Sequence, residues 1–198
     1  GIDVLINIKC AKLYIESVVS YDYKTICDCD VKTTHRYYKL PMLIDMHVHV
    51  REPGDEQKET WDTCSRAALK GGNGLICAMP NTKPSCTNTQ VYNMVDNLAK
   101  NKSVCDYMIF IGANGENYTD LESMKSKVCA IKFYLNETFS TLKINNISVL
   151  RQYFIHCPDD LLMCFHSEVE MVGVVLYLNS IYNKRVHICH ISKKEEIE

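Results

Sequence analysis

Residues 42–50 read Met-Leu-Ile-Asp-Met-His-Val-His-Val, an apolar and β-branched run that ends in two histidines. Similar runs recur along the chain, and longer segments with helical spacing of polar and apolar residues separate them. The strand-like runs are residues 42–50, 75–79, 107–112, 130–135, 161–165 and 186–191. The helix-like segments are residues 59–70, 89–100, 121–127, 147–156 and 168–183. This alternation, with strands apolar on both faces, predicts a parallel sheet covered by helices.

The repeats fit an α/β fold, either a doubly wound sheet or a (β/α)8 TIM-type barrel. We expect the barrel, with about six of its eight strands present. Residues 1–40 are rich in β-branched and aromatic residues and predict a small β-domain before the barrel domain of residues 41–198. Residues 193–198 read as the start of a further helix, so the barrel is expected to be incomplete at the C-terminus.

Composition narrows the possible partners and the compartment. The net charge of −2 gives no reason to expect nucleic acid or a membrane surface as a partner. The start of the chain does not resemble a signal peptide, and the apolar runs are too short to span a bilayer. The 11 cysteines include no Cys-x-x-Cys pair, and many lie in apolar runs. We therefore expect free thiols and a cytoplasmic location.

Candidate metal ligands stand at the strand ends. Side chains alternate along a strand, so His47, His49 and Arg51 are expected on one face, where two imidazoles can reach one metal ion. A lone pair of histidines on a strand is more often satisfied by hydrogen bonds. However, His166 and His190 also end strands, and the carboxyl ends of parallel strands converge on one face of a barrel. This convergence favours a metal site.

Two further polar residues and one cysteine stand at or near the strand ends. Lys132 lies inside an apolar strand, where burial favours a neutral, reactive amine; the alternative is a lysine at the rim that reaches water. Asn81 follows the strand at residues 75–79 and suits a polar ligand, or an ordinary turn. Cys189 neighbours His190 and is expected to point to the other side of the strand as a packed thiol, with a metal role as the less favoured alternative.

Four segments together resemble dihydroorotases of the amidohydrolase superfamily, in particular the dihydroorotase domains of animal multifunctional pyrimidine-synthesis proteins. The segments are Asp45-Met-His-Val-His-Val-Arg-Glu-Pro-Gly54, Ala78-Met-Pro-Asn-Thr82, Lys132-Phe-Tyr-Leu-Asn-Glu-Thr-Phe-Ser140 and His187-Ile-Cys-His190. The resemblance implies an amidohydrolase barrel with two zinc ions bridged by a carboxylated lysine. The implied metal ligands are His47 and His49 for one ion, His166 and His190 for the other, and Lys132 for both.

The resemblance also implies how a small-molecule substrate is held. Arg51 and Asn81 would bind its carboxylate, and Thr138 and Phe139 would lie on a loop that closes over it. The general acid and base is an aspartate that this resemblance places beyond Glu198, so we expect this chain alone to be a poor enzyme. The implied partners are a second copy or other enzymes of the pyrimidine pathway.

The activity implied is the reversible, zinc-dependent cyclisation of N-carbamoyl-L-aspartate to L-dihydroorotate in de novo pyrimidine biosynthesis. One alternative is another cyclic amidase, related to allantoinases or hydantoinases, and the Asn136-Glu-Thr-Phe139 loop argues against it. A second alternative is a catalytically inactive structural domain. The presence of all five implied ligands argues against that alternative.

Overall fold

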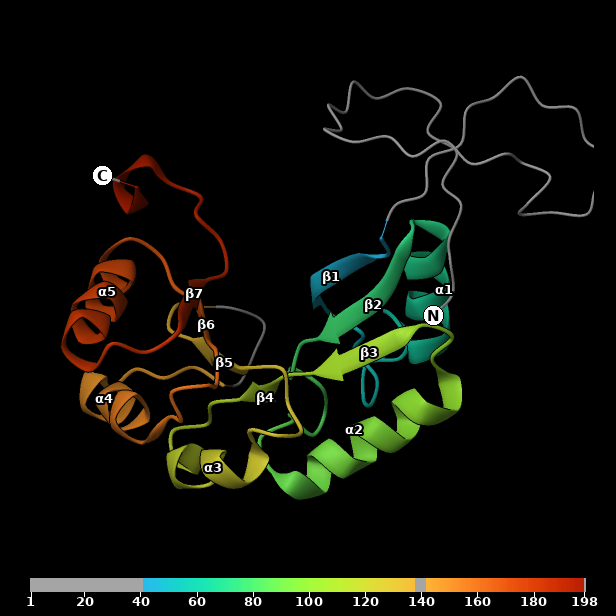
Figure 1. Cartoon of the computed structure of the whole chain (residues 1–198), viewed down its shortest axis with the longest axis horizontal. Helices are drawn as coiled ribbons and strands as arrows, with labels where there is room; N and C mark the ends of the chain where they lie inside the picture. Colours follow the sequence, from blue (N-terminus) through green and yellow to red (C-terminus); the bar gives the residue numbers. More distant parts are fainter. Residues whose placement is uncertain (1–40, 138–141, 198) are drawn as a thin grey trace, which may run out of the picture.

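The computed structural model describes residues 41–137 and 142–197 (Figure 1). The predicted β-domain of residues 1–40 lies outside this range, as do Thr138 and Phe139. The strands are β1 (Leu43–Val48), β2 (Asn73–Ala78), β3 (Asp106–Ile109), β4 (Ile111–Gly112), β5 (Ile131–Tyr134), β6 (Met163–His166) and β7 (Val186–Ile188). The helices are α1 (Trp61–Lys70), α2 (Thr89–Lys102), α3 (Leu121–Met124), α4 (Ile147–His156) and α5 (Glu170–Tyr182).

The strands form two parallel sheets, ordered β1-β2-β3 and β4-β5-β6-β7. The single strand expected at residues 107–112 is wrong, because the pairing partner changes at Phe110. The Phe110 amide donates to the Ala78 carbonyl (2.9 Å), whereas the Ile111 amide donates to the Ala130 carbonyl (3.1 Å). One segment thus joins the sheets, and α2 to α5 follow the outside of the resulting arc of strands (Figure 1).

The two edge strands of this arc, β1 and β7, are not buried on both faces as predicted. On β1, Leu43, Ile44 and Met46 are 49%, 58% and 57% exposed, and β7 carries no buried residue. Each of these strands has a neighbour on one side only within the described residues. The helix start expected at residues 193–198 is instead a 3-10 turn, Lys194–Glu196.

Alternation along the inner strands separates two environments. Phe133 and Phe165 point toward the helices, where their rings stack at 4.5 Å within the largest apolar cluster. The neighbouring Lys132 and Cys164 alternate with them and therefore point to the opposite face. Cys164 packs there in a smaller cluster with Cys77 and Phe110. The site residues thus lie on the face of the sheet away from its helices.

The eight cysteines among the described residues are all free thiols, as expected. No helix within residues 41–137 and 142–197 is long and apolar enough to cross a bilayer.

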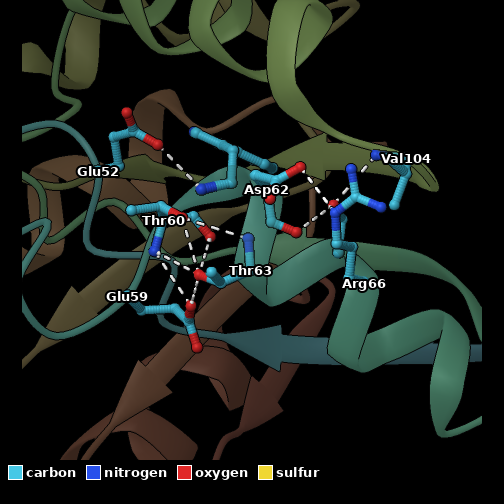
Figure 2. Close-up of polar contacts among 9 residues, drawn as sticks. Glu52, Glu59, Thr60, Asp62, Thr63, Arg66 and Val104 are labelled. Atoms are coloured by element: carbon cyan, nitrogen blue, oxygen red, sulfur yellow. Dashed lines mark hydrogen bonds and ion pairs between the residues drawn. The ribbon is translucent and has the colours of Figure 1, made fainter.

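Glu52 ties the loop after β1 to two helices. Its side chain is 3% exposed, and its Oε2 accepts a hydrogen bond from the Trp61 amide at the start of α1 (2.9 Å; Figure 2). Its Oε1 forms an ion pair with Lys102 at the end of α2. Thr60 caps α1 by accepting from the Thr63 amide (3.2 Å). The loop that carries the neighbouring Arg51 is therefore anchored to the helical layer.

We predict that Glu52→Ala lowers the free energy of unfolding by about 1–3 kcal/mol, because the buried Trp61 amide loses its acceptor. The ion pair adds little to this, since Lys102 is 43% exposed. Urea denaturation measures the change. Glu122→Ala is the matched control, because Glu122 is 70% exposed and pairs only with Lys125 on the surface. Equal losses in the two variants would contradict the anchoring role.

Candidate active site

Four imidazoles lie in a row where strands β1, β6 and β7 end. The ring centroids are 5.2 Å apart for His47 and His49, and 5.0 Å apart for His47 and His190. His166 continues the row, 5.2 Å from His190. The row joins residues as far as 143 positions apart along the chain, because parallel strands place their carboxyl ends at one edge.

Lys132 lies beneath this row. Its side chain is 1% exposed, so the alternative of a lysine at the rim is wrong. Its Nζ donates a hydrogen bond to Cys189 Sγ (2.9 Å) and lies 5.3 Å from the centre of the Tyr134 ring. The expectation that Cys189 points away is also wrong. β7 ends at Ile188, so strand alternation no longer sets the direction of the next side chain.

Burial favours the neutral form of three of the imidazoles. It lowers the pKa of His49, His166 and His190, and the Lys132 charge lowers those of His166 and His190 further. The neighbouring side chains also shift the pKa of the Cys189 thiol. Hydrogen bonds from Cys164 and His47, together with Lys132, lower its pKa. Neutral imidazole is the form that binds metal ions. Nε2 of His166 is buried and makes no hydrogen bond within residues 41–137 and 142–197, although the Glu168 carboxylate lies 3.8 Å away.

Asn81 holds the ring of His49. Its Oδ1 lies 2.8 Å from His49 Nδ1, and this bond raises the pKa of His49 against the effect of burial. An amide oxygen only accepts, so His49 Nδ1 carries the proton and Nε2 presents its lone pair. The amide nitrogen of Asn81 keeps its donors for another partner. The orientation of a metal-binding imidazole is commonly fixed in this way.

Arg51 stands on a constrained loop. Its φ is +68°, a left-handed conformation that is costly for a residue with a side chain. The loop is held against the one after β2, because the Lys83 amide donates to the Pro53 carbonyl (2.8 Å). Gly54 has φ +98°, and a Cβ there would lie 2.5 Å from the Lys83 carbonyl oxygen. These contacts keep the Arg51 charge close enough to lower the pKa of His49.

The described His, Cys, Asp and Glu side chains do not by themselves form a complete metal site. Among residues 41–137 and 142–197, no group of three or more His, Cys, Asp or Glu has an arrangement that could hold a metal ion. Sequence reasoning overlooked Tyr134, which lies two residues after Lys132 on the same strand face and is 4% exposed. The period of two along β5 could have identified it.

The chain belongs to the dihydro-orotase-like family, whose profile matches residues 38–152. It is 38% identical over 200 residues to the multifunctional protein CAD of Squalus acanthias, a match that covers 100% of this chain and 9% of that protein.

Two solved structures share the fold. One is the inactive dihydroorotase-like domain of the Chaetomium thermophilum CAD-like multifunctional protein. It has a TM-score of 0.69 and 21% identity, over 80% of this chain and 47% of that one. The other is the L-hydantoinase of Arthrobacter aurescens, with a TM-score of 0.72 and 16% identity, over 79% of this chain and 43% of that one. The chain thus spans less than half the length of each of these three proteins.

We predict that Lys132→Met raises the pKa values of His166 and His190 in the metal-free protein, because the Lys132 charge lowers both. The rise is partial, since burial is the larger cause and remains. NMR titration of the histidine ring protons measures it. Lys70→Met, at the exposed end of α1, is the control and leaves both values unchanged. Identical titrations in the wild type and Lys132→Met would show that burial acts alone.

The metal-free protein should lose stability as the pH falls from 6.5. Burial lowers the folded-state pKa values of His49, His166 and His190 below about 6.5, the ordinary value of histidine. The unfolded chain therefore takes up protons first, and stability is full above this pH and declines toward the folded values. Thermal unfolding at pH 7.5 and 5.5 measures the loss. His190→Gln removes one titrating ring and should reduce the difference; an unchanged difference would contradict this assignment.

Proposed function

We propose that the protein containing this chain is a dihydroorotase, which interconverts N-carbamoyl-L-aspartate and L-dihydroorotate in de novo pyrimidine biosynthesis. The observation that carries the proposal is the row of four imidazoles over the buried Lys132. Membership of the dihydro-orotase-like family supports it. The complete (β/α)8 barrel is part of the proposal, and the exposed apolar side chains of Ile44 and Met46 on the edge strand β1 support further packing there.

Under this proposal the site holds two zinc ions. His47 and His49 would hold one ion, and His166 and His190 the other; three of these four imidazoles have lowered pKa values. Lys132 is buried with Cys189 as its hydrogen-bond partner, and its carboxylation would turn a costly buried amine into an anion shared by both cations. Zinc pairs of this kind supply an activated water at neutral pH and polarise a carbonyl.

The other side chains would bind and enclose the substrate. Arg51 offers a planar pair of donors suited to a carboxylate. Asn81 would donate from its amide nitrogen to the same carboxylate while its oxygen orients His49. Thr138 and Phe139 would lie on the loop that closes and excludes water. The proposed location is the cytoplasm, in agreement with the free thiols of the described residues. The proposed macromolecular partners are a second copy or other enzymes of the pathway.

We predict that Lys132→Ala removes zinc and lowers the hydrolysis of L-dihydroorotate by at least about 1,000-fold, since each ion loses its shared ligand. Elemental analysis and an absorbance assay measure the two losses in the full-length protein. Added acetate or propionate, which can occupy the space of the missing side chain, should restore part of both. Lys70→Ala is the control and should keep full zinc content and activity.

Assays of the same full-length protein distinguish the dihydroorotase proposal from its alternatives. Turnover of allantoin or hydantoin in preference to dihydroorotate would indicate another cyclic amidase. Bound zinc without any turnover would indicate an inactive domain, and either result would reject the dihydroorotase proposal.

A further inference from the structure

The Tyr134 hydroxyl is a buried donor without a partner. The side chain is 4% exposed, and its oxygen makes no hydrogen bond to any residue that the structure describes. An unpaired buried hydroxyl is costly, and in a native protein it calls for a reason such as a ligand. Tyr153, the other buried tyrosine among the described residues, shows the ordinary arrangement: its hydroxyl donates to Asn117 Oδ1 (2.6 Å) and accepts from the Gly115 amide (2.9 Å).

Tyr134 faces the candidate site. It is adjacent to His166 in the register of β5 and β6, and the two ring centroids are 6.2 Å apart. The Lys132 amine lies 5.3 Å from its ring. Tyr134 therefore lies on the face of β5 that carries Lys132, next to the strand that ends in His166.

We propose that Tyr134 is a further substrate-binding residue, whose hydroxyl donates a hydrogen bond to the carboxylate that Arg51 holds. This inference rests on the proposed function. A phenol hydroxyl and a guanidinium both donate hydrogen bonds, so together they suit an anion. The substrate carboxylate would accept the hydrogen bond that the Tyr134 hydroxyl does not make in the free protein. Dihydroorotate carries such a carboxylate, whereas dihydrouracil and hydantoin do not, so Tyr134 favours the acidic substrate.

Tyr134→Phe tests the inference in the zinc-loaded full-length protein. We expect a loss of about 10- to 100-fold in kcat/KM for L-dihydroorotate, the usual effect of one hydrogen bond to a charged group. The loss should appear in KM rather than kcat, because the carboxylate takes no part in bond cleavage. Zinc content should stay the same. The melting temperature should not fall, because the lost hydroxyl had no partner.

Tyr153→Phe is the matched control. It removes a buried hydroxyl that has two partners, so it should lower the melting temperature and leave KM unchanged. The two variants should therefore give opposite results in the two measurements. A purely structural role for Tyr134 would make them behave alike.

Three results would overturn the inference. An unchanged kcat/KM in Tyr134→Phe, with a large loss in Arg51→Met, would reject the role of Tyr134 and leave the proposed function intact. Loss of zinc in Tyr134→Phe would mean that the hydroxyl acts on Lys132 or the metal ligands. A wild-type protein that neither hydrolyses nor binds L-dihydroorotate, measured by calorimetry, would reject the inference and the proposed function together.

Discussion

The parallel pairing of neighbouring strands is the constraint on which the candidate site depends. The register that places Tyr134 beside His166 also places Lys132 beside Cys164, and both rows face away from the helices. Because all the described strands run in one direction, their histidines meet at one edge of the sheets, although the strands that carry them lie far apart in the sequence. A shift of one residue in this register would turn every such side chain toward the apolar cluster around Phe133 and Phe165.

The polar groups of the site are costly in the absence of ligands. Lys132 is buried, burial lowers the pKa values of three imidazoles, and His166 Nε2 and the Tyr134 hydroxyl make no hydrogen bond among the described residues. Arg51 adds a left-handed backbone conformation. A packed core has no use for such features, whereas a site that binds cations and an anion does. The surrounding fold must supply the compensating stability, partly through the Glu52 contacts that anchor the Arg51 loop.

The two loops that carry Arg51 and Asn81 act as one unit. Contacts of Pro53 and Gly54 with Lys83 hold them together, and Asn81 in turn fixes the ring of His49. Through this arrangement a residue proposed to bind substrate also orients a residue proposed to bind metal. The residues proposed to bind substrate and metal are therefore physically linked at this side of the site.

The sequence by itself determined the alternation of strands and helices and the position of the histidines at strand ends. These follow from side-chain period and apolar pattern, which the local chain carries. Only the tertiary structure decided that the strand at residues 107–112 divides at Phe110, that Cys189 turns toward Lys132, and that Tyr134 has no partner. Each of these three features depends on which strands pair and on the residue at which their pairing ends. Such contacts join residues far apart in the chain, so no local pattern records them.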